Sequence, residues 1–277
     1  MVALKRAEIP VNRYTAYEIE PNAIKISKQN HPQIEHCGDV TEADFTKYHG
    51  FDLLIGGSPC QSLSITTSKN RTHLSGKSRL FWEYVRALEE SKPKYFLFEN
   101  VASMNEESKA IISEQLGCNP IFINSADFSA AERERLYWTN IPILKPMPEP
   151  SELVLKDIME QNVDEKYFYN CDFDFHGYDK TVCATLHING HDILKRVNSP
   201  YAKCQTLTCV SGGNQQKKVM DNGRPRKLTP LEYERGMTLP DNYTNIKGIS
   251  NTARYTAVGN GWTVDVIAWL LSNIPTN

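Results

Sequence analysis

The sequence predicts an α/β fold in which helices cover both faces of a doubly wound, mostly parallel β-sheet. Short β-type runs alternate with helical runs roughly every 25 residues through the first half of the chain, as in successive strand–helix units. The runs 51–55 and 95–98 are largely apolar and do not alternate, which is typical of strands buried on both faces. Glycine or polar residues follow both runs, at the strand ends where such sheets bind ligands.

The individual elements follow from this alternation. Apolar side chains at Leu80, Tyr84 and Leu88 have helical spacing, and Asn22 is placed to cap another helix. We expect helices over 22–30, 80–90 and 108–116, and strands over 13–19, 33–38, 51–55, 95–98, 120–124 and 136–140.

The character of the chain changes near residue 141. Four prolines between 141 and 150 predict a linker, and the Asp-, Asn-, Gly- and Thr-rich stretch that follows predicts a small, irregular domain with β-type pieces such as 204–209. Thr229 and Pro230 have the N-cap and first-turn identities of a new helix. We therefore expect a first domain at 1–140, a second at 141–228 and a segment at 229–277 whose apolar helix, 262–271, packs back onto the first.

Composition indicates an ordinary globular protein, with 40% hydrophobic and 23% charged residues. We find neither a membrane-length apolar run nor a signal-type N-terminal core, and the odd count of seven cysteines favours reduced thiols. These features predict a cytoplasmic protein. His187 and His191 are spaced i, i+4, but no acidic ligand is patterned nearby, so we expect no metal site.

The net charge of −2 gives no support to nucleic-acid binding, which would require cations clustered on one face. One segment, 213–228, is such a candidate, although a solvated basic loop is the alternative. Its cations are Lys217, Lys218, Arg224, Arg226 and Lys227.

The strongest local signal is Cys60, which follows the predicted strand 51–55 and the turn Gly56-Gly57-Ser58-Pro59. A thiol raised above the strand ends is placed as a nucleophile, provided that the site lowers its pKa or accepts its proton. A buried structural cysteine beside a tight turn is the alternative.

Three further motifs carry polar or flexible residues at similar places. Glu99 follows strand 95–98, where partial desolvation favours a proton-donating carboxyl, and a capping or salt-bridged glutamate is the alternative. Arg133 and Arg135 alternate on a strand, so their guanidinium groups should face one site, unless they lie on an exposed basic edge. The two glycines of Gly259-Asn260-Gly261-Trp262 permit close approach to a ligand, or form a simple loop.

The order of these motifs resembles that of the cytosine-5 DNA methyltransferases. Pro59-Cys60-Gln61, Glu99-Asn100-Val101, Arg133-Glu134-Arg135 and Gly259-Asn260-Gly261 match the family's motif set in sequence, and 228–241 resembles a further family motif. Residues 141–228 match loosely, as expected for the family's variable target-recognition domain. The resemblance implies the Rossmann-like fold of class I S-adenosylmethionine-dependent methyltransferases.

The resemblance also implies residue roles. Cys60 would attack C6 of a flipped-out cytosine, Glu99 would hold and protonate N3, and Arg133 and Arg135 would bind near the base carbonyl. S-adenosyl-L-methionine would donate the methyl group to C5, and double-stranded DNA would be the partner. The implied cofactor residues are Glu18, Ile19, Asp39, Val40, Pro59, Asn260 and Trp262. The implied DNA-binding residues are Gln61, Ser62, Thr206, Leu207, Gly212, Gly213, Lys217 and Lys218. The setting would be a bacterial or phage-infected cell, with nucleoid association through DNA.

The start of the chain departs from the family, because Met1-Val2-Ala3-Leu4 resembles the helix that normally follows a first strand and a glycine-rich loop. A missing strand would expose the edges of its two neighbours. Three explanations would account for this departure. The chain could start inside a longer one, a second polypeptide could supply the strand, or the protein could be an inactive relative. We expect this polypeptide alone to methylate DNA poorly or not at all.

Three other functions remain open at the level of sequence. A non-catalytic DNA-binding subunit would keep the fold without binding the cofactor, and the same fold could methylate RNA. A cysteine hydrolase is disfavoured, because no histidine is patterned as the base partner of Cys60.

Overall fold

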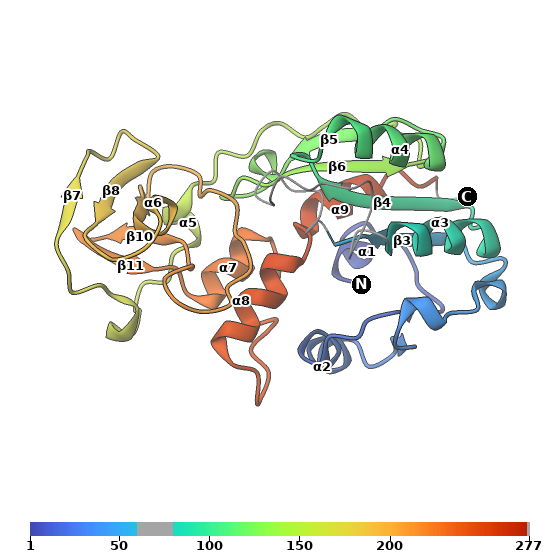
Figure 1. Ribbon diagram of the computed structural model, residues 1–277, viewed down its shortest axis with the longest axis horizontal. Coiled ribbons are helices and arrows are strands. Elements are labelled where there is room, and N and C mark those ends of the chain that lie inside the picture. The colour runs from blue at the N-terminus through green and yellow to red at the C-terminus, as the bar shows by residue number, and fades with distance from the viewer. Residues whose placement is uncertain (60–79, 276–277) are drawn as a thin grey trace.

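The computed structural model describes residues 1–59 and 80–275, and a four-stranded sheet forms the core of one half of the molecule (Figure 1). The strand order is β3-β4-β6-β5. β3 and β4 pair in parallel, whereas β6 is antiparallel to both of its neighbours. Three of the four strands therefore run in one direction, as the mostly parallel prediction requires. The bounds are β3 (Leu53–Gly57), β4 (Tyr95–Val101), β5 (Ile121–Asn124) and β6 (Glu134–Thr139).

Helices cover both faces of this sheet, which confirms the doubly wound prediction. Phe96 and Phe98 pack with side chains of α3 (Leu80–Ser91) and α4 (Glu106–Leu116). Leu97, which alternates with them, packs on the opposite face against α1 (Val2–Arg6) and α9 (Val264–Leu271). The C-terminal apolar helix α9 thus packs on the sheet that the first half of the chain forms.

A separate two-stranded parallel sheet holds the start of the chain. The expected strands 13–19 and 33–38 are reduced to β1 (Thr15–Ala16) and β2 (Glu35–His36). Between them, α2 (Pro21–Asn30) is capped by the Glu20 carboxylate, which accepts the Ala23 N–H, so the expectation that Asn22 is the cap is wrong. Pro21 takes the first helical position instead. Two 3₁₀ turns follow, at Val40–Glu42 and Phe45–Tyr48.

A cavity of about 370 Å³ separates β1 from β3. Tyr14 and Thr15 line one side, and Leu53, Leu54 and Ile55 line the other. β1 and β3 each lie at the edge of their own sheet within the described residues.

The second half of the chain forms a lobe around a five-stranded sheet, ordered β11-β10-β9-β8-β7 (Figure 1). This lobe is more regular than the sequence predicts. The expected β-type run 204–209 is not one of its strands, because Cys204 exchanges backbone hydrogen bonds with Ala130 and Glu132 of the first domain. The lobe's elements are α5 (Leu155–Ile158), 3₁₀ turn Glu165–Tyr167, β7 (Phe173–Phe175), β8 (Val182–Leu186), α6 (Asp192–Lys195), β9 (Arg196–Asn198), β10 (Lys218–Asp221) and β11 (Arg224–Lys227).

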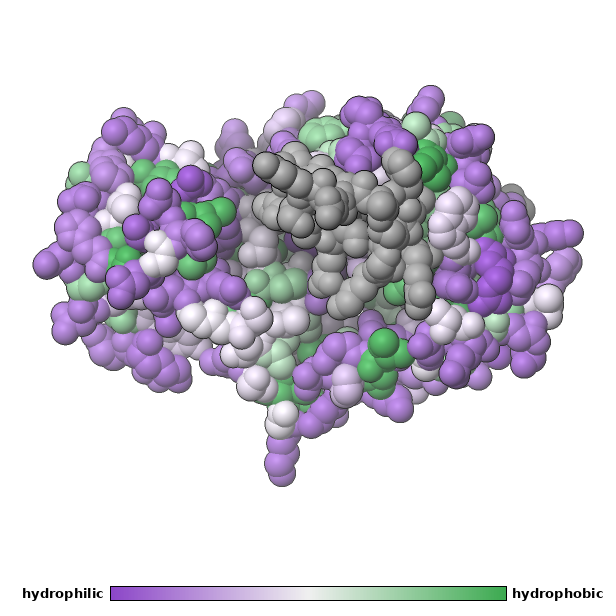
Figure 2. Space-filling model, in the orientation of Figure 1, coloured by the Kyte–Doolittle hydropathy of each residue, from purple (hydrophilic) through white to green (hydrophobic). Residues whose placement is uncertain are grey.

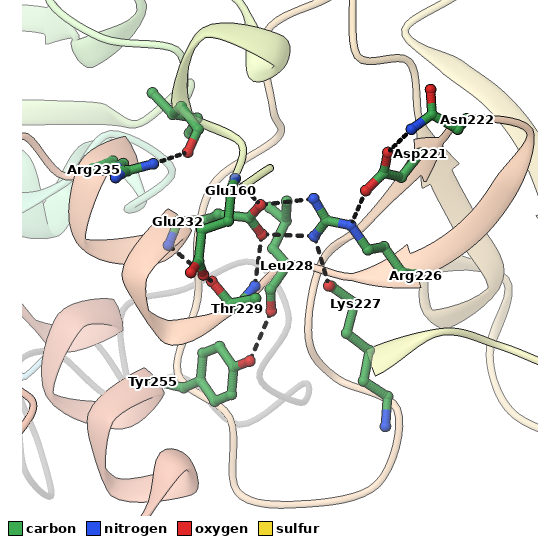
Figure 3. A network of polar contacts seen from close by, with 11 residues as sticks. Glu160, Asp221, Asn222, Arg226, Lys227, Leu228, Thr229, Glu232, Arg235 and Tyr255 are labelled. Carbon is green, nitrogen blue, oxygen red and sulfur yellow. Dashed lines mark hydrogen bonds and ion pairs between the residues drawn. The ribbon is translucent and has the colours of Figure 1, made fainter. Parts of the chain in front are cut away.

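Helices α7 (Pro230–Gly236) and α8 (Asn251–Asn260) stand between the lobe and the main sheet (Figure 1). α7 starts with the predicted Thr229 cap and Pro230, and Glu232 completes a capping box. Arg226 of β11 binds both oxygens of the buried Glu232 carboxylate, at 2.7 and 2.8 Å (Figure 3). This two-point ion pair fixes the lobe's sheet to the start of α7.

The visible face of the molecule is largely hydrophilic, with hydrophobic residues in small separate groups (Figure 2). No helix within the described ranges is both long and apolar enough to cross a membrane.

Candidate active site

Glu99 lies at the centre of the candidate site. It stands inside β4 rather than after it, because the strand continues through Val101 instead of ending at Phe98. Its neighbours across the sheet are Gly57 of β3 and Tyr137 of β6. The sheet itself therefore fixes the backbone of this residue, and its side chain is nearly buried.

Both carboxylate oxygens of Glu99 have partners. Arg135 Nε lies 2.7 Å from Oε1, and Trp262 Nε1 donates to Oε2 at 3.0 Å. Each oxygen keeps a second lone pair, so the carboxyl group can still engage a substrate atom. The contact with Trp262, 163 residues away, was not foreseen, because no local pattern signals it.

Gly57 leads the chain from β3 past Glu99. A Cβ at this position would lie 3.0 Å from the Glu99 carbonyl oxygen, 3.1 Å from Glu99 Oε2 and 3.5 Å from Trp262 Cζ2, so an added methyl group would push against both residues. The Asn100 amide donates to the Ser58 Oγ at 3.1 Å and holds the next residue in place. Pro59 is half-buried, whereas the predicted nucleophile Cys60 and its neighbours Gln61 and Ser62 lie outside the described residues.

Arg133 and Arg135, which alternate along the chain, have different hydrogen-bonding partners. Arg133 precedes β6, and its buried guanidinium donates to the backbone carbonyls of Leu207 (3.2 Å), Gly259 (3.1 Å) and Gly261 (2.9 Å). Burial, together with repulsion from Arg135, lowers the pKa of Arg133 to about 10. Of the two arginines, Arg135 makes the ion pair with Glu99.

The predicted cofactor residues near the N-terminus are organised by local turns. Glu18 Oε1 accepts the N–H groups of Ile19 and Glu20, both at 2.8 Å. Asp39 Oδ1 accepts the Thr41 N–H and hydroxyl, and these hydrogen bonds lower the pKa of Asp39. Val40 begins the turn that Asp39 caps.

Two observations test whether this region fits S-adenosyl-L-methionine. Carboxylates of Glu18 and Asp39 are acceptors suited to ribose hydroxyls and an adenine amine, and the Ile19 side chain, 68% exposed, offers an apolar face for the ring. A cavity of about 190 Å³ is lined by residues that include Ile55 and Trp262. The acceptors and the exposed apolar side chain thus have the chemistry that would suit the nucleoside part of the molecule.

Asn260 faces the lobe rather than this cavity. Its Oδ1 accepts the Cys209 thiol at 2.7 Å. The neighbouring Gly259 is packed against the backbone of Thr208 and Cys209. The turn that the sequence predicts to be flexible is thus tightly packed. It belongs to a seam, which is the contact between the end of α8 and the segment 206–210.

The predicted DNA-binding residues divide into surface and interior positions. Gly212 and Gly213 adopt positive φ values of 135° and 62° in an accessible loop. Leu207 is buried, and its side chain packs in the core beside Gly236. Thr206 and Lys217 are half-buried.

Lys218 is inside the lobe, with its ammonium donating to the carbonyls of Asn214 (2.7 Å) and Gln216 (3.0 Å). Burial lowers the pKa of Lys218 to about 8. Arg226 is also buried, and Arg224 pairs with Glu165. The prediction that the cations of 213–228 form a single solvent-facing basic patch is therefore wrong. Lys218 supports the loop from inside the lobe and does not present its charge to solvent.

No cluster of three or more His, Cys, Asp or Glu side chains suited to a metal occurs in the part of the chain that the structure describes. His187 instead contacts Asp174, with 3.0 Å between Nε2 and Oδ2.

Known proteins resemble the chain over nearly its whole length. A family model described as C-5 cytosine-specific DNA methylase matches residues 2–276. Type II methyltransferase M1.ScrFI of Lactococcus lactis subsp. cremoris is 28% identical over 90% of this chain and 68% of its own length. Type II methyltransferase M.Bsp6I of Bacillus sp. (strain RFL6) is 26% identical over 94% of this chain and 90% of its own. The crystal structure of S. pombe Dnmt2 methyltransferase shares the fold, with a TM-score of 0.72, 21% identity and coverage of 98% and 93% of the two chains.

Proposed function

Because the chain belongs to the family of C-5 cytosine-specific DNA methylases, we propose that it transfers a methyl group from S-adenosyl-L-methionine to C5 of cytosine in duplex DNA. One observation carries the proposal. Glu99 is held between Arg135 and Trp262 beside Gly57-Ser58, the end of β3 that leads to Cys60. Cys60 comes two residues after Ser58 in the sequence.

The proposed reaction starts when the Cys60 thiolate adds to C6 of a cytosine that has left the base stack. Glu99 donates a proton to N3, so negative charge does not build up on the ring, and C5 becomes nucleophilic. S-adenosyl-L-methionine, when bound, would supply the methyl group that C5 takes up and would leave as S-adenosyl-L-homocysteine. A base then removes the C5 proton, the Cys60–C6 bond breaks, and Glu99 recovers its proton from N3.

Arg135 and Trp262 orient Glu99 in this scheme. Arg135 Nε and Trp262 Nε1 occupy different oxygens, so the carboxyl plane cannot rotate without breaking one contact. Such fixed orientation is a large part of what a proton-transfer site contributes. Arg133 supports the site through backbone carbonyls, and we do not assign it a contact with the base.

We assign the DNA contacts to the accessible loop that contains Gly212 and Gly213, together with Thr206 and Lys217. Positive φ values let the loop backbone approach DNA closely. Gln61 and Ser62 complete the proposed DNA-binding set, next to the nucleophile. The buried Leu207 and Lys218 act by shaping this surface.

A further part of the proposal concerns the cavity between β1 and β3. Its two facing strands are sheet edges within the described residues, and Leu53, Leu54 and Ile55 line it. An extended segment from outside residues 1–277, for which a second polypeptide is one source, would pair with both edges. If the coding DNA upstream of Met1 encodes such a strand, co-expressing it should raise the affinity for S-adenosyl-L-methionine. Unchanged affinity would count against this part alone.

The function is tested by transfer of labelled methyl groups to nucleic acid. We expect the chain alone to label duplex DNA at C5 of cytosine at best slowly, to label it faster when the strand proposed above is supplied, and Cys60→Ser to label none in either case. Covalent trapping on DNA or RNA that contains 5-fluorocytosine then separates the substrates. Trapping on RNA alone, or labelling by the serine variant at the parent rate, would contradict the proposal.

A further inference from the structure

We propose that Arg133 is a positioning residue that couples the recognition segment, defined as residues 206–210, to the orientation of Glu99. The link runs through the turn 259–261 and Trp262. This inference rests on the proposed function, since it concerns how DNA bound at the lobe affects the same catalytic carboxyl group.

The first step is the set of carbonyls that Arg133 binds. Leu207 belongs to the recognition segment, whereas Gly259 and Gly261 belong to the end of α8 and the turn after it. A guanidinium is a planar, rigid fork of donors, so it fixes the distance between the groups that it bridges. One buried side chain of the first domain thus holds two segments that are about fifty residues apart in sequence.

The second step is the tight packing of the same two segments. A Cβ on Gly259 would lie 2.4 Å from Cys209 N and 2.5 Å from Thr208 C, so the backbones touch without an intervening side chain. The Thr256 hydroxyl also donates to the Val210 carbonyl at 2.8 Å. A displacement of the recognition segment therefore moves the end of α8 as well.

The third step connects this seam to the catalytic carboxyl group. Trp262 follows Gly261 directly, and its indole N–H donates to Glu99 Oε2. The other oxygen is bound by Arg135, which lies two residues after Arg133. Contacts thus form a closed circuit: Arg133 to Gly261, then Trp262, Glu99 and Arg135, and back along β6 to Arg133.

The energetic setting of Arg133 also favours a positioning role. Within the described residues its buried Nε has no hydrogen-bond acceptor, although the other two nitrogens bind three carbonyls. A buried, incompletely paired cation is costly to fold around, and such groups are found where function requires them.

The consequence is that sequence recognition acts on the chemical step. DNA that fits the accessible loop at 211–213 would hold the recognition segment, and thereby Trp262 and Glu99, in the reactive geometry. A duplex that binds without this fit would leave the carboxyl group misplaced. Discrimination would then appear in the rate of methyl transfer more than in the affinity for DNA.

Amide hydrogen exchange on the full chain tests the coupling. Arg133→Met removes the fork and Arg133→Lys keeps the charge with fewer donors. Arg235→Met is the matched control, since Arg235 likewise bridges to a backbone carbonyl, that of Ile158, but contacts neither segment of the seam. In the free protein we expect Arg133→Met to accelerate exchange at both 206–210 and 259–262, by roughly tenfold or more, and Arg133→Lys to do so less. Arg235→Met should leave exchange at 259–262 unchanged.

Adding duplex DNA gives the second comparison. In the parent chain, DNA should protect both segments, whereas in either Arg133 variant it should protect 206–210 without protecting 259–262. The single-turnover methylation rate should fall while the Kd for duplex changes by less than about twofold, a split that general loss of structure does not produce. Equal protection of 259–262 in parent and variants, or unchanged exchange there in the free variants, would overturn the coupling. Absence of any protection in the parent would refute the proposed DNA binding, and the free-protein comparison would still decide the role of Arg133.

Discussion

The two sides of the candidate site are built differently. On the base side, strands β3 and β4 and the turn before α9 bring Gly57, Glu99 and Trp262 together over long stretches of sequence. On the proposed cofactor side, Glu18 and Asp39 are held by backbone groups one or two residues away. They follow the two strands of the small sheet, which a cavity separates from β3. The comparison teaches that long-range contacts position Glu99, the proposed proton donor, whereas local turns position the proposed cofactor residues. Under the proposal, the placement of these residues relative to Glu99 would depend on what fills the cavity.

The largest expected effect is the loss of the proton donor on the base side. Glu99→Gln keeps the shape of the side chain but removes its acidity, so we expect methyl transfer to fall by a factor on the order of 10²–10⁴. Glu134→Gln, an exposed change 35 positions along the chain and next to Arg135, is the control and should keep the parent rate. Single-turnover kinetics measure both. Parent-like transfer by Glu99→Gln would refute the role of this carboxyl group.

The next largest effect is a loss of turnover that distinguishes a substitution on one face of β3 from a substitution on the other. Gly57→Ala puts a methyl group against Glu99 and Trp262, whereas Gly56→Ala puts one 2.7 Å from the Tyr84 ring in the core. Both should lower the free energy of unfolding by about 1–3 kcal/mol through overpacking. Only Gly57→Ala should also reduce turnover at a temperature where both variants are folded. Urea unfolding and turnover give the comparison, and equal turnover in the two variants would contradict it.

On the cofactor side, two aspartates with matching local structure provide a test. Asp39 caps one 3₁₀ turn through Thr41, and Asp44 caps the next through Thr46. Asp39→Asn should raise the Kd for S-adenosyl-L-methionine about tenfold, since a charged hydrogen bond is lost, and Asp44→Asn should not. Calorimetric titration measures this. Similar losses in both variants would mean that the cap, not a cofactor contact, matters.

The smallest effect concerns the loop that Lys218 supports. Burial lowers the pKa of Lys218 to about 8, so the unfolded chain binds more protons than the folded chain between that value and the ordinary value of 10.5. The parent should therefore gain stability relative to Lys218→Met as pH rises through this window. Urea midpoints measured across it test the sign. Lys180→Met, at an exposed lysine, should show no such pH-dependent difference, and a flat difference for Lys218→Met would contradict the burial.

The sequence predicts the base side better than the rest of the molecule. Strands around Leu54 and Leu97 are recognisable because they are apolar on both faces, and their polar ends locate Cys60 and Glu99. The contact of Trp262 with Glu99 is invisible locally, because it depends on the return of α9 to the sheet. Charge patterning also misplaced Lys218, since a run of cations does not reveal which of them a lobe encloses.

The central claim is that Cys60 adds to C6 of cytosine while Glu99 serves N3. Duplex DNA with tritium at C5 of cytosine tests it without a methyl donor. Addition of the thiolate makes C5 basic, C5 takes a proton from water, and loss of tritium with release of the thiolate restores the base. We predict that the chain releases tritium to water and that Cys60→Ser does not. Equal release by the two proteins, or none by the parent on DNA that it binds, would contradict the claim.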